Sequence, residues 1–335
     1  MKLSRAEVAL LILGLTFVAL APAWAWGIGP TFVRLPDSLK VISDYKGTLT
    51  LFADRVTSRF FPAGQEQVVP LTIHADDRTV PAKSSRNVLV MEEHVTIKDS
   101  SSGVVQAGVR PDAVYALDRR TCENVPGYIE GIDRVGYTVT FPIGSQKKDY
   151  PMWDDELRRC VFAKYTGVSR VDGDKYKNVK VYVYKTPGEM MPMAVPPPGL
   201  PPTISGKAVK VMTGRSDLPV SDTQMMKIDY YKKIVSTTYV EPRTGIVVYV
   251  PSYRYEYYVK NGPGQSPQFM KLAAVQYARD GANARRDVDS AAKYFPLLDL
   301  DQKWAPLSYL LTGLVLIGIG LVVMRRARRR YEGND

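Results

Sequence analysis

The stretch that decides the architecture is Ala305 to Met324, APLSYLLTGLVLIGIGLVVM, which contains no charged residue. As an α-helix it is about 30 Å long, which is the thickness of the hydrocarbon core of a bilayer. A fully buried core helix of a soluble protein is the alternative for such a run. The length, the absence of charge and the arginines that follow all favour a transmembrane helix over residues 305–324.

The residues on either side of this helix predict its orientation. Arg325 and Arg326 begin a block of five arginines that ends at Arg330. Such a block is costly to move across a membrane and therefore stays in the cytoplasm. Trp304 and Tyr309 lie at the other end, where their amphipathic rings suit the outer membrane interface. We therefore expect the chain to cross from outside to inside.

A second apolar run, Val8 to Ile28, follows a short basic segment at the N-terminus. One alternative is a cleaved signal peptide with a small-residue site at Ala23 to Ala25. The other is an uncleaved anchor with Trp24 and Trp26 at the outer interface. Both place the residues that follow outside the cytoplasm.

The chain between the two apolar runs is predicted to be mainly β. Val179 to Tyr184 and Tyr253 to Val259 alternate in polarity with period two, and Gly, Pro, Asp and Ser separate such runs. Gly281 to Leu298 has a helical composition that Pro296 interrupts. We expect a large curved or barrel-like antiparallel sheet with few helices. The predicted order is a cytoplasmic segment 1–7, a membrane helix 8–28, an extracytoplasmic domain 29–304, a membrane helix 305–324 and a cytoplasmic tail 325–335.

The charge balance is basic but gives no sign of nucleic-acid binding. The 335 residues include 45 Lys and Arg against 34 Asp and Glu, which gives a net charge of +11. The basic residues are scattered among acidic ones, and the predicted export excludes nucleic acid as a partner. Anionic lipid, a polyanionic envelope or ordinary solubility each explain the surplus.

Two cysteines, Cys122 and Cys160, fall in the part that is predicted to be exported. The expected outcome in an oxidising compartment is a disulfide, which would stabilise the fold by about 4 kcal/mol on the chain-entropy model. The alternatives are two buried thiols or a metal pair. The metal pair lacks the further ligands that a zinc site needs.

No catalytic constellation is recognisable, so we expect neither an enzyme nor a bound cofactor or metal. The two histidines, His74 and His94, lie on strand-like sequence, and no nucleophile elbow, zinc motif or glycine-rich phosphate loop occurs. Two acidic runs, Asp154 to Glu156 and Asp172 to Asp174, suit turns. Calcium is the alternative, but neither run has the spacing of a known calcium loop.

One uncharged stretch, Met190 to Pro202, is rich in proline and methionine. It is either a stiff loop over the core or a lip that contacts lipid or another hydrophobic ligand. On the second interpretation the candidate ligand portal consists of Met190, Met191, Met193, Val195 and Leu200.

The hairpin Tyr230 to Val250 turns at Val240-Glu241-Pro242-Arg243-Thr244-Gly245, with Pro and Gly at positions that suit a turn. Together with Leu117 to Cys122 and an apolar run at each end, it resembles the actinobacterial PorA-like family, a domain of unknown function whose name implies a porin. This resemblance favours the uncleaved anchor and hence a chain held in the membrane at both ends.

The motif Val240, Glu241, Pro242, Thr244 and Gly245 is also similar to one in the class B scavenger receptors, which include fatty-acid and cholesterol transporters. That resemblance implies an apolar tunnel through a β-rich ectodomain, so the first hypothesis is binding and transfer of lipid at the cell membrane. A second hypothesis is docking onto envelope proteins without a cavity. A third is a pore formed by self-association, with Gly313, Gly318 and Gly320 allowing close helix contact.

Overall fold

A computed structural model of the chain gives the fold. It describes residues 5–29, 33–52, 64–104, 112–129, 131, 133–197, 200–213, 216–260 and 269–332. The chain divides into two compact units. The helical unit combines Met1–Arg34 with Lys293–Asp335, and the β unit is Leu35–Ala292.

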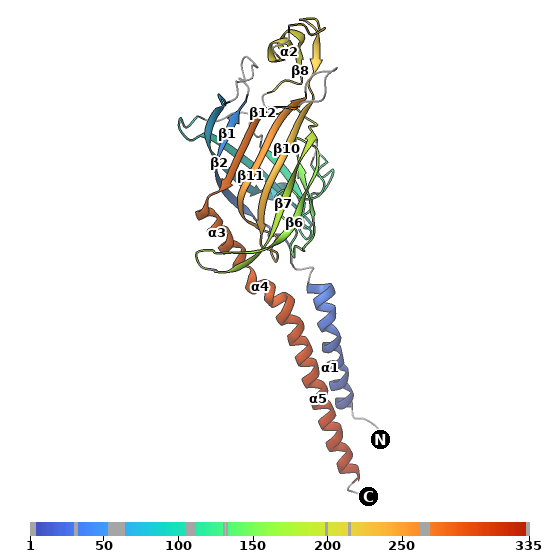
Figure 1. Cartoon of the computed structure of the whole chain (residues 1–335). Helices are drawn as coiled ribbons and strands as arrows, with labels where there is room; N and C mark the ends of the chain where they lie inside the picture. Colours follow the sequence, from blue (N-terminus) through green and yellow to red (C-terminus); the bar gives the residue numbers. More distant parts are fainter. Residues whose placement is uncertain are drawn as a thin grey trace. The chain divides into compact units, whose positions relative to one another are not determined.

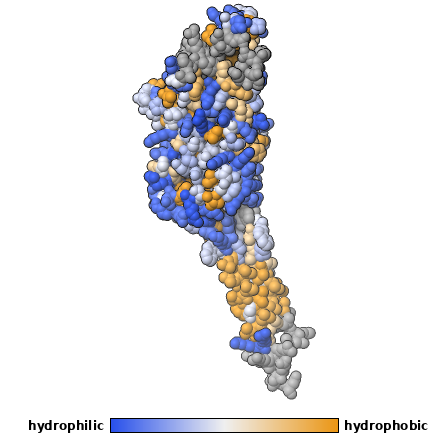
Figure 2. Space-filling model, in the orientation of Figure 1, coloured by the Kyte–Doolittle hydropathy of each residue, from blue (hydrophilic) through white to orange (hydrophobic). Residues whose placement is uncertain are grey.

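The helical unit is an antiparallel pair of long helices (Figure 1). Helix α1 (Arg5–Ala23) continues into a π-helical segment (Trp24–Ile28), and α4 (Phe295–Asp299) leads through a second π-helical segment (Leu300–Trp304) into α5 (Ala305–Glu332). The helical stretches Val8–Ile28 and Gly281–Arg326 are long and apolar enough to cross a membrane. Figure 2 shows their hydrophobic surface. Both apolar helices predicted from the sequence are confirmed as helices.

The β unit contains one ten-stranded antiparallel sheet, which confirms the predicted fold class. Its strand order is β4-β3-β2-β1-β12-β11-β10-β7-β6-β5. The strands are β1 (Lys40–Leu51), β2 (Gln67–Thr79), β3 (Val88–Asp99), β4 (Ala113–Asp118), β5 (Tyr150–Asp154), β6 (Arg159–Val171), β7 (Val179–Pro192), β10 (Tyr230–Val240), β11 (Val247–Lys260) and β12 (Phe269–Arg279). The chain between β7 and β10 adds a small sheet of β8 (Thr203–Ser205) and β9 (Met225–Lys227) with helix α2 (Gly206–Thr213).

The sheet is curved but is not closed into a barrel, because its edge strands β4 and β5 do not pair with each other. The irregular chain between them, residues 119–149, contacts both edges instead, and we call it the bridging segment. The amide of Val125 donates to the carbonyl of Ala116 in β4, and the amide of Tyr137 donates to the carbonyl of Pro151 in β5. The amide of Asn124 donates to the carbonyl of Gly136, which joins the two passes. An unpaired edge exposes free N–H and C=O groups, so this segment protects both edges.

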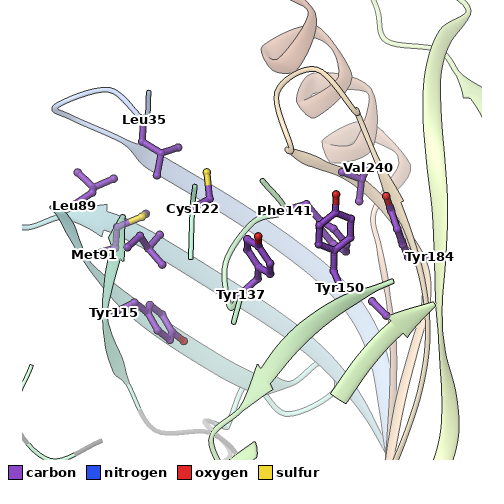
Figure 3. Packing of buried hydrophobic residues seen from close by; sticks show 12 residues of the cluster. Leu35, Leu89, Met91, Tyr115, Cys122, Tyr137, Phe141, Tyr150, Tyr184 and Val240 are labelled. Atoms are coloured by element: carbon purple, nitrogen blue, oxygen red, sulfur yellow. The ribbon is translucent and has the colours of Figure 1, made fainter. Parts of the chain in front are cut away.

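The largest buried cluster lies beside this bridging segment (Figure 3). The ring of Phe141 stacks on Tyr184 with centroids 4.6 Å apart, and Tyr150 packs edge-on against both Phe141 and Tyr137. Three further clusters line the same concave side of the sheet, which we call the inner face. Their buried members are Leu49, Leu51, Leu71, Ile73, Ile97, Val275, Tyr230, Tyr257, Val259, Leu272, Leu157, Val161 and Ile234.

One element differs from the sequence-based prediction in detail. The predicted helix over 281–298 is divided into α3 (Gly281–Ala292), which packs on β11 in the β unit, and α4 in the helical unit. Pro296 lies in the first turn of α4, where its missing N–H costs nothing. The alternating run from Val104 to Val109 also predicts a strand, but it falls almost wholly outside the described residues.

Candidate functional site

The motif that carried the family resemblance is the turn between β10 and β11. Glu241 is 1% exposed, and its carboxylate accepts three hydrogen bonds within the turn. The donors are the amide of Arg243 at 3.1 Å, the amide of Thr244 at 2.8 Å and the hydroxyl of Thr244 at 2.7 Å. Burial raises the pKa of Glu241, and these hydrogen bonds oppose that shift.

This turn also anchors the bridging segment. Gly245 has a φ of 75°, and a Cβ there would lie 2.2 Å from the carbonyl oxygen of Phe141. The Gly245 carbonyl accepts from the amide of Phe141 at 3.1 Å and from the hydroxyl of Thr140 at 2.7 Å. The motif residues Val240, Glu241, Pro242, Thr244 and Gly245 are thus brought together in one turn, which hydrogen bonds join to Thr140 and Phe141. Their geometry serves folding.

The acidic run after β5 lies over the inner face. Lys232 of β10 is 6% exposed and lies on the same face as Tyr230 and Ile234. Its ammonium is 2.6 Å from Asp154 Oδ2 and 2.8 Å from Glu156 Oε2. These carboxylates raise the pKa of Lys232 although burial opposes that shift. The lysine is therefore charged at neutral pH.

Like Asp154, the other two carboxylates of this run have partners within the protein. The hydroxyl of Tyr257 donates to Glu156 Oε1 at 2.9 Å. Asp155 accepts from Arg134 Nε at 2.7 Å and from Trp153 Nε1 at 2.8 Å. All three carboxylates are therefore bound by the protein's own donors. Among the described residues no group of acidic, histidine and cysteine side chains is arranged to hold a metal ion.

The second acidic run and both histidines have partners within the protein. Asp172 accepts the amide of Asn178, as expected for a turn, and Asp174 pairs with Arg285 of α3. The ring of His94 lies 2.9 Å from Asp112, which raises the pKa of this exposed histidine. His74 pairs in a similar way with Asp44 at 2.6 Å.

The methionine and proline stretch is not a free loop over its whole length. Met190, Met191 and Pro192 belong to β7, and Met191 lies opposite Lys232 of β10. Met191 and Met193 are half-buried and pack against the inner-face clusters. Val195 and Leu200 are half-buried as well, and Leu200 packs against the cluster around Tyr257. The role of these five residues as a ligand portal remains a prediction.

The expected disulfide is not formed, which corrects the sequence-based prediction. Cys122 and Cys160 are both free thiols. Cys122 is fully buried in the cluster beside the bridging segment, and burial raises its pKa to about 11. Cys160 lies on β6 with its sulfur 3.5 Å from the carbonyl of Val135. A disulfide requires the two Cβ atoms to lie within about 4.5 Å of each other, which sequence position alone does not reveal.

The predicted membrane-interface residues separate to the two ends of the helical unit. Trp24 packs against Tyr309 with ring centroids 5.6 Å apart, and its indole donates to the carbonyl of Asp301. Trp26 and Trp304 are exposed near the same end. Arg325 and Arg326 are exposed towards the other end of α5.

Glycines form the contact between the two helices. A Cβ on Gly313 of α5 would lie 2.7 Å from the carbonyl oxygen of Gly14 in α1. Gly320 lies against Leu11, whereas a Cβ on Gly318 would meet open space. Gly313 and Gly320 therefore serve contact within the chain. Gly14, which the sequence analysis did not single out, is the matching small residue on α1.

Comparison with known proteins gives one family. The sequence model described as Porin PorA matches residues 6–322. A Porin PorA of Corynebacterium amycolatum is 23% identical over 289 residues, which is 77% of this chain and 70% of the relative. The chain therefore belongs to the Porin PorA family.

Proposed function

We propose that this protein is a membrane-anchored subunit of an envelope pore that several copies form together. The family description supports a pore. The main support for the proposal is that both helices of the helical unit expose large apolar side chains. Water penalises such exposure at about 25 cal/mol per Å², whereas lipid does not. The exposed side chains include Ile12, Leu13, Leu15, Leu311, Leu314, Val315, Ile319, Leu321 and Val322.

One chain is too small to enclose a membrane pore by itself. Helices α1 and α5 touch directly at Gly14 and Gly313, so they leave no passage at their contact. The strands do not supply a transmembrane wall, because the sheet is open and basic side chains are exposed on it. A lipid-facing barrel surface is apolar instead. The exposed basic residues on strands include Lys40, Lys46, Arg78, Lys98, Lys164, Lys180 and Lys185.

Conductance across a planar lipid bilayer tests this proposal. The purified full-length protein should produce discrete current steps, and their frequency should rise more steeply than linearly with protein concentration because several copies assemble. Heat-unfolded protein and protein-free detergent are the controls. Bilayers that contain the folded protein but conduct no more than the controls would reject the pore and leave docking onto envelope proteins as the function.

Position-specific labelling tests whether the helices line the passage. Thr312 has an exposed side chain, and Leu314 lies about 160° away around the same helix. In a protein with both native cysteines replaced by serine, a charged methanethiosulfonate should reduce the conductance of Thr312→Cys. Leu314→Cys is the matched control, because its side chain would face lipid. Equal effects at both positions would contradict a passage lined by this face of α5.

Lipid transfer by the β unit has less support. Met191 and Met193, two of the proposed portal residues, pack against buried clusters on the inner face. The tyrosines of that face pack on one another, with Tyr253 stacked on Tyr277 at a centroid distance of 5.0 Å. Mass spectrometry of lipids that co-purify with the protein tests this function. A stoichiometric lipid that is lost in Met191→Asp but kept in the exposed variant Met225→Asp would favour it over the pore.

A further inference from the structure

The basic end of α5 is helical rather than an irregular tail. The helix runs without interruption from Ala305 to Glu332, so it continues past Met324, the last residue of the apolar run. Five of the next six residues are arginines. At about 1.5 Å per residue they concentrate five positive charges within about 9 Å of helix length. Arg325 and Arg326 are exposed.

The helical register places the first two of these arginines away from α1. Gly313 and Gly320 are the buried positions of α5 that contact α1, and they are seven residues apart. Position 327, an alanine, continues this spacing. At about 100° per residue, Arg325 lies about 160° and Arg326 about 100° from this line around the helix. The five arginine positions are Arg325, Arg326, Arg328, Arg329 and Arg330.

The aromatic end of the same hairpin sets the depth of the arginines. Tyr309 packs on Trp24 at the end where tryptophans gather, and aromatic rings of this kind favour the membrane interface. The helix rises about 24 Å from Tyr309 to Arg325, which is close to the thickness of the hydrocarbon core. The arginines therefore reach the headgroup layer of the opposite leaflet. Helix α1 begins at Arg5 and is antiparallel to α5, so a further basic residue belongs to the same end.

We propose that the arginine positions 325–330 of α5 form a binding surface for anionic phospholipid headgroups. A guanidinium binds a phosphate oxygen pair through two parallel N–H donors and keeps its charge at any physiological pH. Near a membrane surface each basic residue contributes about a five-fold preference for anionic lipid. Because the exposed residues Arg325 and Arg326 lie away from the contact with α1, they can bind lipid while the two helices stay packed together. This inference does not depend on whether the protein forms a pore.

The test measures which lipids surround the full-length protein. The purified protein is placed in nanodiscs that contain phosphatidylglycerol and phosphatidylcholine in equal amounts, and the lipids that remain bound are counted by native mass spectrometry. We expect phosphatidylglycerol to be enriched at least five-fold over phosphatidylcholine. Raising the salt from 0.1 M to 1 M should remove most of this enrichment, because the Debye length falls from about 10 Å to about 3 Å.

Variants distinguish this surface from the general charge of the protein. Changing all five arginines to glutamine should abolish the enrichment, and changing them to lysine should keep most of it. The matched control is a protein in which exposed β-unit residues, Arg120, Arg159, Lys164, Lys180 and Lys185, are changed to glutamine, and it should keep the full enrichment. Ten millimolar inorganic phosphate should not displace the lipid. The proposal is wrong if the wild-type protein shows no preference or if the five-glutamine variant retains it.

Discussion

At the residue scale, the turn after β10 shows how a short motif can be explained by folding alone. Glu241 would be costly to bury as an isolated carboxylate, but it has three donors within the same turn. Thr244 supplies two of these donors, and Gly245 permits the backbone to return towards β11. Hydrogen bonding and the limited room for a side chain therefore explain the residue types of this motif, and the explanation requires no ligand.

Gly245→Ala tests this explanation. The substitution should destabilise the protein by more than 3 kcal/mol, because it combines a left-handed φ with a Cβ 2.2 Å from the carbonyl oxygen of Phe141. For a domain of this size that lowers the melting temperature by roughly 6–12 °C. Gly144→Ala is the matched control, since Gly144 has the same φ of 75° but open space around it. It should cost only about 1–2 kcal/mol. Equal losses in thermal unfolding would show that the close approach at Gly245 is unimportant.

Residue types predicted the turn but not its partners. Pro242 and Gly245 identify a turn from local geometry, which the sequence displays directly. The contact with Thr140 and Phe141 joins segments about a hundred residues apart, so no local pattern reports it. The disulfide prediction was wrong for the same reason, because the compartment suggests pairing whereas pairing depends on the distance between two segments that are remote in the sequence.

At the element scale, α3 packs within the β unit through polar and charged contacts with β12, β1 and the loop between β6 and β7. Asp287 of α3 lies 3.0 Å from Arg279 of β12, and the Asn283 amide donates to Asp44 of β1. On the other side Asp289 accepts the backbone amides of the loop between β6 and β7, including Lys175. Helix α3 is short and only partly apolar, so these contacts fix its position.

This arrangement predicts a pH dependence centred on Asp287. Burial raises its pKa to about 6, while Arg279 and Arg286 lower it and Asp44 raises it. A carboxylate whose folded pKa is raised keeps its proton in the folded state after the unfolded state has lost it, so stability should fall as the pH rises from about 4 to about 6 and change little above that. Between pH 7.5 and 5.0 the gain from this group is about 1.4 kcal/mol.

Melting temperatures at these two pH values provide the measurement. The wild type should gain about 3–6 °C on acidification relative to Asp287→Asn, which cannot titrate. The exposed variant Glu189→Gln removes the same charge elsewhere and should keep the wild-type pH profile. If the wild type and Asp287→Asn have identical pH profiles, another group causes the pH dependence of the melting temperature.

The elements themselves were partly predictable. Strands such as β11 and β12 alternate in polarity, so their existence could be predicted, and the two long helices are evident from hydrophobic runs alone. The ten-strand order was not predictable, because it depends on which distant edges pair. The small sheet of β8 and β9 with α2 was missed because its strands have only three residues each, too few to show a period.

At the scale of the whole molecule, the protein combines a membrane hairpin with a large β unit. Because α1 and α5 are antiparallel, the N-terminus of α1 and the C-terminus of α5 lie at the same end of the hairpin (Figure 1). The sequence predicted this relation from basic residues at both chain ends. It did not predict that Gly14 and Gly313 would hold the two helices together. Both helices of the hairpin are long and apolar enough to cross a membrane.

This organisation makes a prediction about sidedness. The arginines at the C-terminal end of α5 should keep both chain ends in the cytoplasm, and the β unit should lie outside. Single cysteines at Lys147 in the β unit and at Glu332 after the arginines, in a protein without its native cysteines, distinguish the possibilities. A membrane-impermeant maleimide should label Lys147→Cys in intact cells stripped of their outer envelope, and Glu332→Cys only after permeabilisation. Labelling of Glu332→Cys in intact cells would reverse the orientation, and a mature chain that lacks residues 1–25 would show that the first helix is a cleaved signal rather than half of the anchor.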